Sequence, residues 1–148
     1  KNKKLNYKKY NSAIIKFLQN HKVKIIFEPG RSIIGNTGVL VTKVIYIKDS
    51  GRKKFVILDA AMNDLMRPAL YNSYHKILNI STKNQDFDKY DVVGPVCESS
   101  DVFATNYNLP ISLRNDIIVI CSTGAYGESM SSNYNLRNSI KSYFSNSI

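Results

Sequence analysis

The chain has 148 residues, of which 43% are hydrophobic, and carries a formal net charge of +10 at pH 7. This length can enclose one sizeable hydrophobic core, and no apolar run is long enough for a membrane-spanning helix. Cys97 and Cys121 are the only cysteines, which implies neither a disulfide scaffold nor a four-ligand zinc site. The lysine-rich start lacks the apolar segment of a secretion signal, so we expect a cytoplasmic location and no membrane partner.

The positive charge raises the question of nucleic-acid binding. The basic residues are scattered, and the densest cluster stands at the start of the chain: Lys1, Lys3, Lys4, Lys8 and Lys9. Lys, Asn and Ile are frequent together, which indicates a genome-wide compositional bias. We therefore expect no nucleic-acid partner.

The first 37 residues predict half of a repeating β/α unit. Residues 5–20 place apolar side chains on one helical face with lysines opposite, and residues 23–27 form a β-rich run. Glu28-Pro29-Gly30-Arg31 follows, in which Pro29 stiffens the backbone and Gly30 lets it approach a ligand closely. The free amides and the Arg31 guanidinium can hold a phosphate or a carboxylate. A turn with a surface ion pair at Glu28 is the alternative interpretation.

From residue 38 onward the pattern is typical of a mostly antiparallel β domain. Residues 32–37 are ambiguous between a turn and a short helix, and Asp49-Ser50-Gly51 predicts a hairpin turn. Residues 59–71 and 81–88 are predicted as connections, and residues 136–144 as a C-terminal helix. The predicted strands are residues 38–47, 53–58, 74–80, 91–96 and 115–121.

Three later loops are also rich in reactive side chains. Arg67 and Tyr71 flank Pro68, Cys97 and Glu98 follow the Gly94-Pro95 turn, and Tyr126 stands between two glycines. A carboxylate beside a thiol disfavours the thiolate, so Cys97 suits a proton donor better than a nucleophile.

The remaining candidates for chemistry are weaker. A small buried residue is the alternative interpretation for Cys97, and Cys121 fits that description because it ends an apolar strand. His21 and His75 have no partners at the spacing of metal ligands or a catalytic triad, so no metal site is predicted.

The four loops together resemble the C-terminal part of the diaminopimelate decarboxylase family, which are pyridoxal-phosphate enzymes of the alanine-racemase-like fold type. Order and spacing agree over residues 22–137. The matching blocks are Glu28-Pro29-Gly30-Arg31; Asp59-Ala60-Ala61-Met62 with Arg67-Pro68-Ala69-Leu70-Tyr71; Gly94-Pro95-Val96-Cys97-Glu98-Ser99-Ser100-Asp101; and Gly124-Ala125-Tyr126-Gly127 with Met130-Ser131-Ser132-Asn133-Tyr134-Asn135.

The resemblance implies a mainly β fold with flanking helices. Residues 1–37 would be the end of a β/α barrel, comprising a helix, the last strand and the loop 28–31. Residues 38–148 would be a C-terminal β-barrel or sandwich domain with a C-terminal helix. The resemblance also implies a homodimer whose active sites are shared across the subunit interface.

The resemblance assigns one set of residues to pyridoxal 5'-phosphate. Glu28 would face the pyridine nitrogen and keep it protonated. Pro29, Gly30 and Arg31 would lie at the cofactor phosphate, and Tyr126 would touch both the phosphate and the substrate.

A second set would bind meso-diaminopimelate, which the family converts to L-lysine and carbon dioxide. Arg67 and Tyr71 would hold the distal end of the substrate, because the arginine fork matches a carboxylate. Glu98 would bind the distal ammonium, and Cys97 would reprotonate Cα across the dimer interface. Arg31 would also reach a substrate carboxylate.

The chain departs from the family in two ways. Ala60-Ala61 and Ser100 stand where the family commonly has glycines. The cofactor lysine of the family lies in the N-terminal barrel, and no lysine here has a comparable motif. We therefore expect the chain to be a C-terminal portion that is inactive alone, whether as a split product, a truncated gene or part of a longer chain.

Two other functions stay open. Related decarboxylases act on ornithine, arginine or carboxynorspermidine, but they tend to have Asp beside the cysteine. Glu98 together with Arg67 instead favours a substrate with a distal carboxylate and a distal ammonium. The non-enzymatic alternative is a basic β domain that binds nucleic acid or protein, although the aromatic-basic stripe of single-strand binders is missing.

Overall fold

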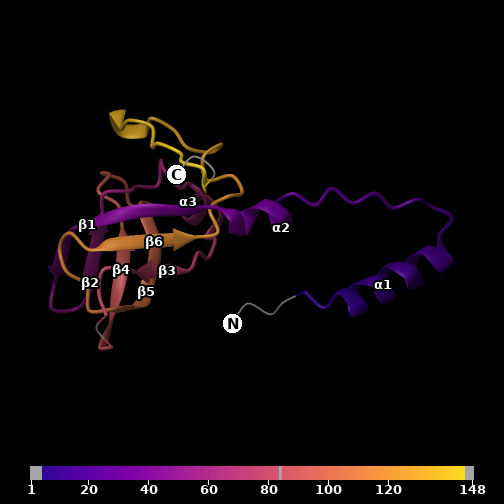
Figure 1. The fold of residues 1–148 in the computed structure, drawn as a ribbon, viewed down its shortest axis with the longest axis horizontal. Helices are drawn as coiled ribbons and strands as arrows, with labels where there is room; N and C mark the ends of the chain where they lie inside the picture. The colour runs from indigo at the N-terminus through magenta and orange to yellow at the C-terminus, as the bar shows by residue number, and fades with distance from the viewer. Residues whose placement is uncertain (1–4, 84, 146–148) are drawn as a thin grey trace.

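In the computed structural model, which describes residues 5–83 and 85–145, six strands form one sheet (Figure 1). The strands are β1 (Val39–Asp49), β2 (Lys54–Leu58), β3 (Ile77–Asn79), β4 (Phe87–Val93), β5 (Val102–Pro110) and β6 (Ile117–Cys121). The helices are α1 (Tyr7–Asn20), α2 (Arg31–Ile34) and α3 (Arg67–Tyr71), with 3-10 turns η1 (Gly35–Thr37) and η2 (Tyr134–Leu136). The mainly β prediction is confirmed.

The strand order is β3-β6-β1-β2-β4-β5, and every pair is antiparallel except β2–β4. The long strand β1 serves both halves of the sheet, because it pairs with β6 through its first half and with β2 through its second. The register shifts between Val44 and Tyr46, where β1 changes partner. Such an irregularity lets a strand bend, so one sheet can curl toward a barrel.

The core fills the inside of this curled sheet. Inward positions alternate along β1, where Leu40, Thr42 and Val44 are buried while Val39, Val41 and Lys43 are exposed. The cluster of buried apolar side chains consists of Leu40, Val44, Val56, Leu58, Ala60, Leu65, Ile77, Tyr90, Val92, Phe103, Leu109, Ile118 and Ile120.

The sheet is nearly closed by one tyrosine. The edge strands β3 and β5 share no ladder, but the Tyr107 hydroxyl of β5 accepts from the Ile77 amide at 2.9 Å. The same hydroxyl donates to the Ile77 carbonyl at 3.3 Å. A side chain thus satisfies backbone groups that a strand partner would otherwise pair.

We expect Tyr107→Phe to destabilise the sheet by about 1–3 kcal/mol, because two half-buried backbone groups lose a partner. Burial, followed by the neighbouring Tyr74, raises the pKa of Tyr107 to about 12. The folded state therefore favours the neutral hydroxyl, and stability should fall as the pH rises above the ordinary tyrosine value of 10.0.

Urea unfolding at neutral and alkaline pH measures both effects. Tyr46→Phe, at an exposed tyrosine of β1, is the control. An alkaline decline that is equally steep in wild type and Tyr107→Phe would show that Tyr107 is not the titrating group.

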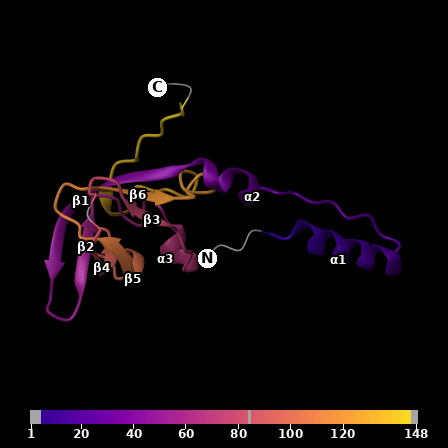
Figure 2. The same cartoon turned by 60° about the horizontal axis from the view of Figure 1, so that its bottom comes forward.

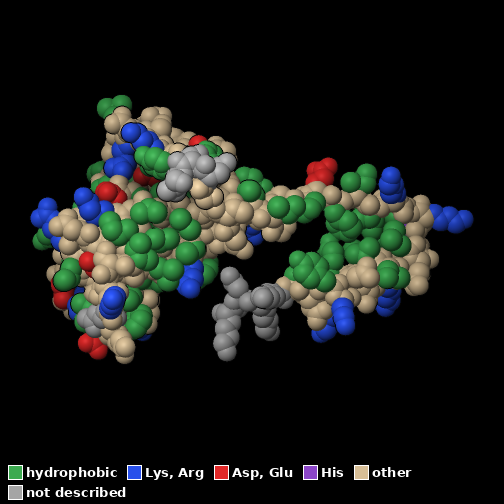
Figure 3. All heavy atoms as spheres, viewed as in Figure 1, with side chains coloured by type: hydrophobic (Ala, Val, Ile, Leu, Met, Phe, Trp, Pro, Cys, Tyr) green, Lys and Arg blue, Asp and Glu red, His purple; other side chains and the backbone are tan. Residues whose placement is uncertain are grey.

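An arm precedes the sheet. After α1 the chain turns and runs back beside the helix, and both views show this arm standing away from the strands (Figures 1 and 2). The Tyr10 and Phe27 rings meet at 5.9 Å between centroids. Figure 3 shows apolar side chains gathered along the inner side of the arm, and Ile15, Ile26 and Phe27 are among its exposed apolar residues. The arm therefore leaves these apolar side chains uncovered by the other described residues.

The helix predicted over residues 5–20 is confirmed, but residues 23–27, predicted as a strand, form no strand within the described chain. Residues 21–30 form no regular element, because no strand of the described residues lies beside them to supply hydrogen bonds. The ambiguous segment 32–37 is helical. Lys1, Lys3 and Lys4 of the basic cluster lie outside the described residues. Within the described ranges, no helix has the length and apolarity of a bilayer span.

Other boundaries also differ from prediction. Strand β5 was not predicted, the strand expected over 74–80 shrinks to β3, and the one expected over 91–96 begins earlier as β4. The predicted connection 59–71 ends in the helix α3. The predicted helix over 136–144 is wrong: residues 137–144 are irregular, and Asn135 and Leu136 have left-handed φ values of 58° and 59°. Two such residues end any helical continuation.

Candidate active site

A pocket of about 290 Å³ is lined by Arg67, Tyr71, Tyr126 and Met130. The helix α3 places Arg67 and Tyr71 four residues apart and therefore on one face. The Arg67 guanidinium carbon lies 5.2 Å from the centroid of the Tyr71 ring and 5.5 Å from that of Tyr126. Both rings can attract the cation through their faces. The structure thus brings together three predicted site residues from two loops.

The backbone at Tyr126 is strained. Its φ is 68°, in the left-handed region that costs a residue with a Cβ about 1–2 kcal/mol. The turn is held by hydrogen bonds from the Gly127 amide to the Thr123 carbonyl and from the Met130 amide to the Tyr126 carbonyl, both 3.2 Å. Strain of this kind persists where surrounding structure imposes it, often at functional sites.

The loop containing Gly30 and Arg31 packs against the Tyr126 turn. A Cβ at Gly30 would lie 3.5 Å from the Tyr126 hydroxyl oxygen. The Gly124 amide donates to the Gly35 carbonyl at 3.1 Å. A Cβ at Gly124 would lie 2.3 Å from the Ile34 carbonyl oxygen, so the two backbones approach more closely than any side chain allows.

The loop 28–31 offers donors that the chain itself does not use. Across residues 5–83 and 85–145, the amides of Arg31 and Ser32 at the start of α2 have no acceptor. Within the same ranges the Glu28 carboxylate has no hydrogen-bond or ion-pair partner, and it is exposed together with Pro29. These groups are free to bind a ligand.

Cys97 and Glu98 do not line the pocket. Cys97 is an exposed free thiol. The Ser100 amide and the Ser99 hydroxyl, at 3.3 and 3.2 Å from the Glu98 carboxylate, lower the pKa of Glu98. The thiol and a charged carboxylate are therefore presented together on the surface.

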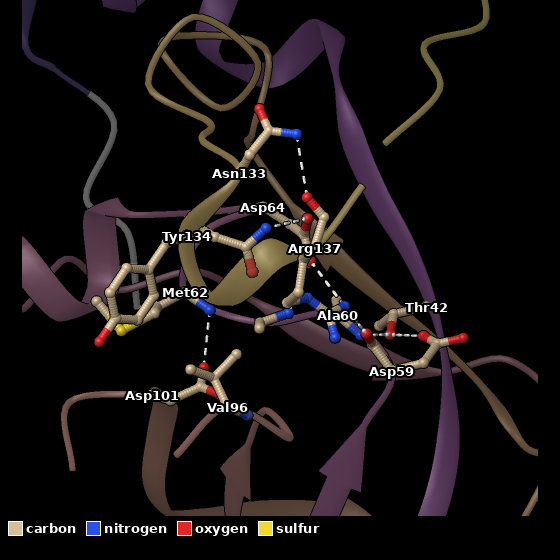
Figure 4. A network of polar contacts seen from close by, with 12 residues as sticks. Thr42, Asp59, Ala60, Met62, Asp64, Val96, Asp101, Asn133, Tyr134 and Arg137 are labelled. Carbon is tan, nitrogen blue, oxygen red and sulfur yellow. Dashed lines mark hydrogen bonds and ion pairs between the residues drawn. The ribbon is translucent and has the colours of Figure 1, made fainter. Parts of the chain in front are cut away.

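A partly buried polar network, which no sequence motif indicated, supports these loops (Figure 4). The segment 59–65, between β2 and α3, receives contacts from three other segments. The Thr42 hydroxyl of β1 donates to Asp59 at 2.5 Å, and the Asp101 carboxylate accepts from the Met62 amide at 2.7 Å. No local spacing in the sequence signals these contacts, since they join residues 17 and 39 positions apart.

The C-terminal tail completes the network. Arg137 donates to the Asp59 carbonyl and lies 3.5 Å from the buried Asp64 carboxylate. The Asn63 side-chain amide donates to the Ser132 carbonyl at 3.1 Å. The tail is thereby fastened across segment 59–65. Met130, which lines the pocket, precedes this fastened stretch.

No metal centre emerges from the described part of the chain, where no three His, Cys, Asp or Glu side chains group to hold an ion.

Residues 10–124 match the sequence model of the pyridoxal-dependent decarboxylase C-terminal sheet domain. The chain is 49% identical over 120 residues to the diaminopimelate decarboxylase of Aquifex aeolicus, covering 81% of this chain and 29% of that protein. It is 52% identical over 122 residues to that of Bacteroides thetaiotaomicron, covering 82% and 31%.

A solved structure of a relative is also similar to this chain. The crystal structure of diaminopimelate decarboxylase from Helicobacter pylori complexed with L-lysine has a TM-score of 0.78 and 46% sequence identity, covering 91% of this chain and 34% of that one. The chain thus spans less than a third of the length of the two curated relatives above.

Proposed function

Because this chain belongs to the pyridoxal-dependent decarboxylase family, whose C-terminal sheet domain it carries, we propose that it is the C-terminal portion of a diaminopimelate decarboxylase. The reaction is the conversion of meso-2,6-diaminopimelate to L-lysine and carbon dioxide. The observation that carries the proposal is the grouping of Arg67, Tyr71 and Tyr126 around one pocket beside the Gly30–Arg31 loop.

The residues present fit pyridoxal 5'-phosphate. The unused amides of Arg31 and Ser32, the Arg31 guanidinium and the nearby Tyr126 hydroxyl are donors that suit a phosphate dianion. Glu28, which pairs with no other residue of the described ranges, would hold a proton on the pyridine nitrogen. When bound, the cofactor supplies an electron sink for the carboxylate's departure as carbon dioxide.

The remaining residues would recognise and protonate the substrate. Arg67, whose guanidinium lies over two aromatic rings, would bind the distal carboxylate with its fork, and Tyr71 would support it. Glu98 would pair with the distal ammonium, and Cys97 would deliver a proton to Cα. Since Cys97 does not line the pocket of its own chain, we assign it to the pocket of a second subunit in a homodimer.

The proposal divides the chain at Gly38. Residues 1–37 would complete a β/α barrel, whose remaining part would cover the apolar side of α1 and allow residues 23–27 to pair as its last strand. Residues 38–148 would form the sheet domain. The barrel portion would supply the cofactor lysine, and the complete enzyme would work in the cytoplasm.

A chimaera tests the function. The chain replaces the matching portion of the Aquifex aeolicus enzyme, and carbon dioxide release is measured with meso-diaminopimelate, L-ornithine and L-arginine. We expect turnover of diaminopimelate by the chimaera. The 148-residue chain alone should neither hold the cofactor stoichiometrically nor turn over.

Other results of the chimaera experiment would change or contradict the proposed function. Preference for ornithine or arginine would replace the substrate assignment with that of the related decarboxylases. A folded chimaera that releases no carbon dioxide from any of the three, or turnover by the chain alone, would contradict the proposal.

A further inference from the structure

The carboxylate of Asp101 joins the turn that bears Cys97 to the segment that leads to Arg67. Asp101 is only 3% exposed, and both of its carboxylate oxygens accept backbone hydrogen bonds. Oδ1 accepts from the Met62 amide at 2.7 Å, and Oδ2 accepts from the Val96 amide at 2.8 Å. Figure 4 shows Asp101 pointing toward Met62, with Val96 beside it. Val96 precedes Cys97, and Met62 lies five residues before Arg67.

The turn 94–101 is built around this side chain. The Gly94 amide donates to the Asp101 carbonyl at 3.0 Å, and the Asp101 amide donates to the Glu98 carbonyl at 3.1 Å. A Cβ at Gly94 would lie 2.3 Å from Oδ2 of Asp101, so any residue with a side chain at position 94 would displace the carboxylate. The carboxylate therefore fills the inside of the turn whose outer side presents Cys97 and Glu98.

Segment 59–65 and the Cys97 turn are held in place by different contacts. Segment 59–65 is also anchored by Thr42, Ser132 and Arg137. For the Cys97 turn, the Asp101 carboxylate supplies the bond to Val96 and a bond to the backbone of segment 59–65, and the Ser100 hydroxyl, 3.5 Å from the Met62 sulfur, adds a weaker contact between the two segments. Removing the carboxylate should release the Cys97 turn while leaving Arg67 in place.

Burying the Asp101 carboxylate costs desolvation free energy. Burial raises the pKa of Asp101, while the amides of Val96 and Met62 and the charge of Arg137 act in the opposite direction and Asp64 adds to the rise. An uncharged turn would avoid this desolvation. A feature that costs stability and touches a reactive turn is best explained by what it positions.

We propose that Asp101 is a positioning residue that fixes the Cys97–Glu98 turn relative to the Arg67 segment. Its place in catalysis rests on the function proposed above, whereas the link between the two segments rests on the geometry alone. In the homodimer assigned above, Asp101 would thereby set how far the proton donor reaches toward the other subunit's pocket.

The link is tested in the 148-residue chain by amide hydrogen exchange. Asp101→Asn replaces one acceptor oxygen with a donor, and Gly94→Ala displaces the carboxylate without removing its charge. Either variant should speed exchange of the Val96 and Met62 amides about tenfold or more, with the Ile118 and Ile120 amides in β6 unchanged. Asp88→Asn, at a less buried carboxylate that pairs with Lys54, is the matched control.

The catalytic role is tested in the chimaera. Each variant should lower kcat about tenfold or more while KM for diaminopimelate stays within about twofold, because the donor moves and the Arg67 clamp does not. The two changes together should be far from additive, since both act on one contact. A merely structural Asp101 would change kcat and KM together.

The outcomes separate the two proposals. Unchanged exchange at Val96 and Met62 would overturn the link. Faster exchange with unchanged kcat would overturn the positioning role while leaving the enzyme assignment intact. A wild-type chimaera without activity would overturn the function, and the exchange result would still decide the link.

Discussion

Cys97→Ala should lower kcat about 10²- to 10⁴-fold in the enzyme that contains this chain, with little change in KM. The reason is that a proton donor acts in the chemical step, while substrate anchoring belongs to Arg67 and Tyr71. Steady-state kinetics with meso-diaminopimelate measures both constants. Cys121→Ala, which removes the half-buried thiol of β6, is the matched control and should leave kcat nearly unchanged.

Mixed dimers test whether Cys97 acts across the interface. Subunits with Cys97→Ala are combined with subunits that lack the cofactor lysine, so each parent is inactive. About a quarter of the wild-type activity should return, because half of randomly assorted dimers are mixed and each holds one complete site. No recovery, or a loss that appears entirely in KM, would contradict the assignment of Cys97 as a donor to the second subunit's site.

Arg67→Ala is expected to lower kcat/KM for diaminopimelate about tenfold to a hundredfold. A charge-assisted hydrogen bond contributes about 1.5–3 kcal/mol, and each 1.4 kcal/mol corresponds to a factor of about ten. Arg67→Lys keeps the charge but loses the planar fork and its contacts with the Tyr71 and Tyr126 rings, so its kcat/KM should fall between those of wild type and Arg67→Ala.

Arg114→Ala, at an exposed arginine in the loop before β6, is the control for loss of one positive charge. The loss at Arg67 should be specific for substrates with a distal carboxylate, so slow turnover of L-ornithine should change little. Unchanged efficiency on diaminopimelate after Arg67→Ala would remove Arg67 from substrate recognition.

The sequence by itself determined the family and most of the sheet. The alternation along residues 39–44 encodes one buried and one exposed face, and such a pattern needs no knowledge of the partner strand. The reactive residues of the four loops could also be identified from the sequence, because the reactive side chains of each loop stand close together along the chain. Arg67 and Tyr71 share a face once a helix forms between them, and the structure does place them on one pocket.

Tertiary contacts decided the elements that sequence reasoning missed. Strand β5 contains Asn106 and Asn108, which are poor strand formers, yet pairing with β4 and the bond from the Asn106 amide to Asp91 at 2.7 Å hold it. Residues 23–27 have strand propensity without a neighbouring strand, and they remain irregular. The tail follows its anchor at Arg137 rather than the helical pattern of residues 136–144.

The position of Cys97 relative to Arg67 was also decided only in three dimensions. A buried carboxylate 39 residues along the chain from Met62 sets it, and no local pattern marks such a pair. Propensity and periodicity arise from neighbours within a few residues, whereas burial of Asp101 depends on the whole sheet being closed. The sequence therefore named the reactive groups, and the fold determined which of them face one another.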